Sequence, residues 1–209
     1  MSKPLTSWPT ALCLALIGAV SLASGAPAAP VVITVLDAGG QPVANAAVSI
    51  EVTGARAQAA AGTQAEMGQR FRAFVPSVLV VQTGTAVNFP NFDTVRHHIY
   101  SFSAAKPFEI KLYSGTPASP VVFDKPGTAI LGCNIHDRMA GFIHVVSTPY
   151  FALSDKIGQV ALDVPAGEHT LQIWHPGLGD KQPPERQPIK VAASSGARLT
   201  VRVGVAHQP

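Results

Sequence analysis

The residues best suited to chemistry lie in one short segment, 133–139, whose sequence is CNIHDRM. It holds a thiol at Cys133, an imidazole at His136 and a thioether at Met139, and two more imidazoles lie upstream at His97 and His98. One Cys, two His and a weakly bound Met form the ligand set of a blue-copper electron-transfer site. Zinc gains nothing from Met, and iron–sulfur clusters need several cysteines, so this set predicts copper.

Residues 1–26 are typical of a signal peptide. Lys3 is followed by an apolar run over 11–20, and the small residues 24–26 suit a signal peptidase, with Ala29 as an alternative end. An apolar run this short does not span a bilayer, and the mature chain shows no other span. We therefore expect export, with a bacterial periplasm as the destination. Cleavage would remove Cys13 and leave Cys133 as a lone thiol in an oxidising compartment, which metal ligation explains.

Composition indicates short strands rather than helices. The chain has 209 residues with 18 Gly and 18 Pro, and only 13% of them are charged. The net charge of +3 is too small to suggest nucleic-acid binding. We expect an all-β fold with strands over 31–35, 46–52, 78–81, 86–89, 99–103, 121–123, 128–131, 141–146, 158–164, 168–174 and 199–203.

Several local expectations accompany these strands. The first two strands are expected to form a hairpin, as are 78–81 and 86–89. Segment 54–68 is expected to be a loop or short helix, and 176–188 a loop. Phenylalanines 89, 102, 123 and 142 are expected in the core, whereas histidines 144, 169, 175 and 207 lack ligand spacing and are expected at the surface or at strand edges.

At this point the chain resembles the cupredoxins, in particular amicyanin and the plastocyanin-like proteins labelled methylamine utilisation proteins. The resemblance covers roughly residues 67 to 153. It is carried by these motifs in order: FPNFD at 89–93, HHIYSFS at 97–103, FE at 108–109, LYSG at 112–115, FDKPG at 123–127 and CNIHDRM at 133–139. It implies a Greek-key β-sandwich that binds one copper ion and passes single electrons.

The resemblance also implies a role for each site residue. Cys133 would be the equatorial thiolate, His136 the imidazole at the exposed edge and Met139 the axial thioether. His97 aligns with the first His ligand and is preferred over His98, although alternation groups His98 with the apolar Tyr100 and Phe102. Adjacent strand residues point in opposite directions, so the two histidines are not expected to share one ion.

A further residue, Asn91, has two readings that remain open. It would either brace the site from behind the ligands or serve as an ordinary turn residue after Pro90.

The segments on either side of the copper region are similar to carboxypeptidase-regulatory-like domains. The expected organisation is a signal peptide at 1–26, an N-terminal strand pair and loop at 27–66, a cupredoxin domain at 67–148 and a C-terminal β module at 149–209. One hypothesis inserts the cupredoxin domain between two halves of a small flanking sandwich. The alternative makes the N-terminal hairpin the first strands of the cupredoxin. Insertion requires contacts between 31–52 and 158–174.

The leading functional prediction is a periplasmic one-electron carrier that is not an enzyme. Its expected partners are redox proteins, such as a periplasmic dehydrogenase or a cytochrome, and the chain is expected to be a monomer. The alternative is a copper-handling protein that delivers or stores the metal, although such sites favour more Met than the three present here. A multicopper enzyme would need a second cluster of histidines.

Overall fold

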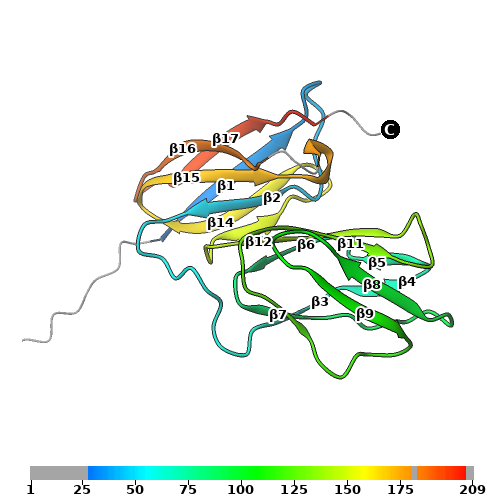
Figure 1. The fold of residues 1–209 in the computed structure, drawn as a ribbon. Helices are drawn as coiled ribbons and strands as arrows, with labels where there is room; N and C mark the ends of the chain where they lie inside the picture. The colour runs from blue at the N-terminus through cyan, green and yellow to red at the C-terminus, as the bar shows by residue number, and fades with distance from the viewer. Residues whose placement is uncertain (1–27, 180–182, 206–209) are drawn as a thin grey trace, which may run out of the picture.

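The computed structural model describes residues 28–179 and 183–205, and within them the chain is almost entirely β (Figure 1). The all-β prediction is therefore confirmed. The predicted signal peptide at 1–26 lies outside these ranges, as does His207. No helix in the described part of the chain has the length and apolarity needed to cross a membrane.

The upper lobe in Figure 1 is built from both ends of the described chain. One sheet has the order β14 (Gln159–Pro165), β1 (Ala28–Leu36), β17 (Ala197–Arg202), and the other has the order β13 (Phe151–Leu153), β2 (Ala47–Glu51), β15 (Gly167–Trp174), β16 (Glu185–Val191). Alternate residues of these strands face a shared core that includes Ile33, Val48 and Leu171.

The lower lobe contains the residues predicted to bind copper. A five-stranded sheet has the order β6 (Val78–Gln82), β12 (Ala140–Val146), β11 (Gly127–Cys133), β8 (His97–Ser101), β9 (Phe108–Tyr113). A three-stranded sheet has the order β10 (Val121–Phe123), β7 (Thr85–Asn88), β3 (Gln64–Glu66), and β4 (Gly68–Arg70) pairs with β5 (Ala73–Val75). Phe89 and Phe123 lie in its core, as predicted.

Both predicted hairpins are wrong. β1 pairs with β14 and β17, whereas β2 pairs with β15 and β13 in the other sheet. Likewise β6 pairs with β12, whereas β7 pairs with β10 and β3. A glycine-rich turn reverses the chain but does not decide whether the next strand stays in the same sheet or crosses to the facing one. The observed pairings do bring 31–52 next to 158–174, as the insertion hypothesis requires.

Two predicted loops contain strands. Residues Gln64–Glu66 form β3, which pairs in parallel with β7 of the lower lobe, although sequence alone grouped them with the N-terminal segment. Residues Glu185–Val191 form β16 despite Pro188, because β16 is an edge strand in which a missing N–H is tolerated. The described residues of the second loop before β16 also include a short 3₁₀ turn, η1 (Pro176–Leu178).

The two lobes meet through the outer face of β6 and β12. Both faces of β12 are covered, because Ile143 and Val145 point into the lower core while Phe142 and His144 point toward Trp174 of β15. The His144 ring stacks on Trp174 at 4.9 Å between centroids, with 3° between the planes. The surface position predicted for His144 is therefore wrong. Burial lowers the pKa of His144 to about 4, so the ring is neutral at pH 7.

Candidate metal centre

Strand alternation places the first two candidate ligands on one face of the five-stranded sheet. In β8 the inward residues are His97, Ile99 and Ser101, and in β11 they include Leu131 and Cys133. Cys133 pairs directly with Ile99 across the two strands, so His97 lies diagonally next to the thiol on the same buried face.

The residue before the thiol, Gly132, leaves room for the ring of Tyr100 on the neighbouring strand β8. A Cβ on Gly132 would lie 2.6 Å from the Tyr100 ring, which packs over the Gly132 backbone on the outer face. A larger residue here would require the Tyr100 ring to move away from β11.

The loop after β11 brings the remaining candidates back toward the thiol. The His136 N–H donates to the Cys133 carbonyl at 3.3 Å, and the Met139 N–H donates to the His136 carbonyl at 2.9 Å. These two successive turns give a three-residue period in which Cys133 and Met139 are buried, His136 is half-buried and the residues between them are exposed. The Asn134 N–H also donates to the His98 carbonyl at 3.1 Å, which ties the loop to β8.

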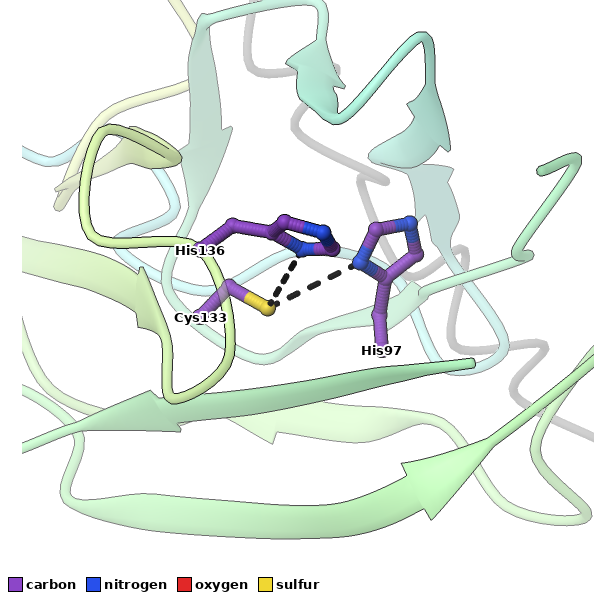
Figure 2. A group of neighbouring side chains, drawn as sticks. All are labelled: His97, Cys133 and His136. Carbon is purple, nitrogen blue, oxygen red and sulfur yellow. Dashed lines mark hydrogen bonds between the residues drawn. The ribbon is translucent and has the colours of Figure 1, made fainter. Parts of the chain in front are cut away.

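The result is a compact group of three donor atoms (Figure 2). Cys133 Sγ lies 3.6 Å from His97 Nδ1 and 3.7 Å from His136 Nδ1. The two imidazole rings have centroids 5.0 Å apart and planes inclined by 54°, so both Nδ1 atoms face the sulfur rather than each other's ring faces. His97 is fully buried, whereas His136 reaches the surface.

These separations suit a shared metal ion. With metal–sulfur and metal–nitrogen bonds of about 2.3 and 2.0 Å, ligands at trigonal to tetrahedral angles lie roughly 3.5–3.7 Å apart. The donor set, one thiolate and two imidazoles, matches a trigonal copper site. Cys133 is also a free, buried cysteine, so no disulfide competes for its sulfur.

The fourth candidate, Met139, is 2% exposed and belongs to the same buried cluster as Cys133. Its position immediately after the second turn of the loop keeps it on the inner side. The structure thus brings three of the four predicted residues into direct contact, and it buries Met139 in the cluster that contains Cys133.

The structure separates the two adjacent histidines clearly. His98 points to the other face of β8, where its Nε2 is hydrogen-bonded to Glu109 Oε1 at 2.8 Å. The apolar alternation that favoured His98 as the inward residue is misleading, because Phe102 on that face is 86% exposed and not in the core.

We expect His97→Ala and His98→Ala to differ sharply in copper affinity. Removing a residue that hydrogen-bonds a metal ligand lowers the metal affinity about 10–100-fold, so removing the His97 donor itself should lower it further. His98→Ala should leave the affinity unchanged, since its ring faces away from the sulfur. Competition titrations with a chelator of known affinity measure both, and equal losses in the two variants would contradict the assignment of His97.

Hydrogen bonds of Asn91 and Tyr113 brace the segment that carries His97, and of these two residues the sequence pointed only to Asn91. Asn91 Nδ2 donates to the carbonyls of Val95 and Tyr113 at 2.9 and 3.1 Å, and Asn91 Oδ1 accepts from the Asp93 N–H at 2.9 Å. Asn91 is therefore both a turn residue and a brace for the loop that delivers His97. Tyr113 OH donates to the Phe89 carbonyl at 2.7 Å, and burial raises the pKa of Tyr113 to about 12.

Asp93 is the residue near the site that sequence reasoning missed. Its Oδ2 lies 2.9 Å from Nε2 of His97, on the ring edge opposite the sulfur. Burial alone would raise the pKa of Asp93, but hydrogen bonds from the Arg72 N–H, the His97 ring and the Phe71 N–H outweigh it and lower that pKa. The available signal was a carboxylate four residues before the His ligand candidate.

With this geometry in view, comparison with solved structures gives a consistent result. The chain is similar to solved structures of cupredoxins. A purple cupredoxin from Nitrosopumilus maritimus matches 40% of this chain and 98% of its own, at 22% identity and a TM-score of 0.34. A reduced Cu(I) form of an amicyanin variant at pH 4 matches 47% of this chain and 97% of its own, at 20% identity and a TM-score of 0.35.

A second reduced amicyanin variant has the same coverage and identity, with a TM-score of 0.36. The predicted resemblance to cupredoxins is thereby confirmed at the level of structural likeness. No family model and no curated protein sequence matches the chain. The ligand geometry, rather than this likeness, supports a metal centre.

Proposed function

We propose that this protein is a type 1 copper protein that carries single electrons between redox partners. The observation that carries the proposal is the buried Cys133 sulfur, contacted by two imidazole nitrogens at 3.6 and 3.7 Å. Cys133, His97 and His136 would hold one copper ion, with Met139 as the weak axial donor. Bound copper supplies one-electron chemistry through its Cu(I) and Cu(II) states.

The protein contributes a donor set that is already assembled. His97 and Cys133 come from paired strands, and His136 is held by turns that close on the Cys133 carbonyl. Because these elements are hydrogen-bonded independently of any metal, the donors need little movement between oxidation states. A small rearrangement on electron transfer favours a carrier over a protein that releases its metal.

The half-buried His136 ring is the proposed route for electrons to a partner. It is the candidate ligand that reaches the surface, and the neighbouring Ile135 is 46% exposed. A redox protein docking here would bring its own cofactor close to the copper through one imidazole. We propose a periplasmic partner such as a dehydrogenase or a cytochrome, with residues 1–26 directing export.

We also propose that the copper domain is inserted in a flanking sandwich. The strands before it (β1 and β2) pair with strands after it (β14 and β15), so neither half of the upper lobe is complete alone. The upper lobe would hold the copper domain in a fixed position through the β6 and β12 face.

Loading the purified protein with Cu(II) tests the electron-carrier proposal. A carrier should show an intense sulfur-to-copper absorption band with narrow copper hyperfine splitting, and it should pass through repeated voltammetric cycles without losing copper. A copper-handling protein should instead show weak colour and surrender the metal to a chelator during reduction. The second result would replace the carrier proposal with the handling one.

A further inference from the structure

Asp93 makes three hydrogen bonds that join two parts of the lower lobe. Its Oδ2 accepts from His97 Nε2 and from the Arg72 N–H, both at 2.9 Å, and its Oδ1 accepts from the Phe71 N–H at 2.7 Å. The side chain is only 13% exposed. One carboxylate therefore bridges a candidate copper ligand and the turn between β4 and β5.

The bond to His97 determines where that ring carries its proton. An ionised carboxylate only accepts hydrogen bonds, so His97 Nε2 must be the protonated nitrogen. His97 Nδ1 is then left with a free lone pair, and it is this atom that faces Cys133 Sγ at 3.6 Å. A carboxylate on the far side of a ligating imidazole also raises the basicity of the donor nitrogen.

We propose that Asp93 is a positioning residue that fixes the proton of His97 on Nε2 and makes Nδ1 a stronger donor to Cu(II), so that the reduction potential is lowered. This inference rests on the copper site proposed above. A stronger nitrogen donor and a nearby negative charge both favour the higher oxidation state of the metal.

The other two bonds of Asp93 hold the β4–β5 turn. Arg70 pairs with Ala73, so Phe71 and Arg72 alone form the turn, with φ of 57° and 59°. Such two-residue turns normally use Asn-Gly, because other residues are strained at positive φ. The Phe71 side chain is 86% exposed, so besides the β4–β5 pairing it is the two carboxylate bonds that help to hold this turn.

The neighbouring residue provides a matched control. His98 Nε2 bonds to Glu109 Oε1 at 2.8 Å, almost the same length as the His97–Asp93 contact, but on the outer face of the sheet. Glu109→Gln removes one charge and alters one imidazole–carboxylate bond without touching the candidate ligands. A general charge effect would appear in both variants, whereas positioning of His97 appears only in Asp93→Asn.

Asp93→Asn is the decisive substitution. Asn offers one acceptor oxygen in place of two and carries no charge, so it cannot keep all three bonds. We expect Cu(II) affinity to fall about 10–100-fold, as for other partners behind a metal ligand. Each tenfold loss of Cu(II) affinity that leaves the Cu(I) affinity unchanged raises the reduction potential of this one-electron couple by about 59 mV. Glu109→Gln should change neither quantity, and a wild-type potential in Asp93→Asn would overturn the proposal.

A second set of variants separates the effect of Asp93 on His97 from its effect on the β4–β5 turn. Phe71→Asn combined with Arg72→Gly installs the favoured turn pair, so that the hairpin no longer depends on Asp93. If Asp93→Asn still raises the potential in this background, the effect acts through His97. If the effect disappears, Asp93 serves only the hairpin and the proposal is wrong.

Nitrogen-15 NMR of the metal-free protein supplies a readout that does not depend on copper. The His97 proton is expected on Nε2 in the wild type, and a proton on Nδ1 would overturn the proposal. This measurement remains decisive even if the protein binds no copper, a result that would instead defeat the proposed function.

Discussion

Replacing Cys133 with serine should abolish the sulfur-to-copper absorption band completely. The band requires a thiolate, and a serine hydroxyl does not ionise at neutral pH in its place. We also expect Cu(I) affinity to fall by more than about 100-fold. That is the largest loss typical when a hydrogen-bond partner of a metal ligand is removed, whereas here the soft donor itself is lost. Visible and EPR spectra of copper-loaded Cys133→Ser, together with competition titrations for Cu(I), measure both effects.

Two controls make the serine result specific. Asn134→Ser changes the next residue, which is exposed, and should keep the band. For the metal-free Cys133→Ser protein the free energy of unfolding should lie within about 1 kcal/mol of the wild-type value, because both imidazoles remain available to hydrogen-bond the hydroxyl. A colour that survives in Cys133→Ser would mean that copper is bound elsewhere, and the candidate centre would be wrong.

Replacing Trp174 with alanine should cause the largest loss of stability among single substitutions between the lobes. The side chain is 5% exposed, stacks on His144 at 4.9 Å and contacts Phe142 at 5.8 Å between ring centroids. Removing a buried aromatic of this size lowers the free energy of unfolding by about 3–5 kcal/mol. Denaturant unfolding of the metal-free protein measures the change.

Phe102→Ala is the matched truncation for Trp174→Ala. Phe102 is also aromatic but is 86% exposed, so its loss should change the free energy of unfolding by no more than about 0.5 kcal/mol. The copper spectrum should be unchanged in Trp174→Ala, because the candidate ligands lie on the opposite face of the five-stranded sheet. A loss below 1 kcal/mol in Trp174→Ala would mean that the lobes barely stabilise each other, contrary to the observed packing.

Local sequence was sufficient for those parts of the site whose geometry is local. Cys133, His136 and Met139 were predicted as ligands from their spacing in one short segment, and the structure folds that segment into two successive turns, with the His136 N–H donating to Cys133 and the Met139 N–H donating to His136. Most strands were also predictable, because the alternation of buried and exposed residues, as in β1 and β11, follows from the local order of residue types.

The pairing of strands within the sheets was not predictable in the same way. Both predicted hairpins failed because strand pairing depends on which distant segment completes a sheet, as β14 does for β1. Apolarity also failed to identify the inward face of β8, where buried His97 and Ser101 face the interior while Phe102 faces solvent. On this strand polar side chains lie inside and an aromatic one lies outside, which is the reverse of the usual pattern.

The sequence by itself therefore determined the all-β class, the identity of the candidate donors and the loop that carries three of them. Only the tertiary structure decided between His97 and His98, buried His144 against Trp174 and placed the Asp93 carboxylate on the ligand ring. For the first two the physical reason is distance along the chain, because turn spacing and strand alternation act over a few residues, whereas Cys133 and Trp174 come from strands far away in the sequence. Asp93 is only four residues from His97, and its contact depends on how the short segment between them folds back onto the ring.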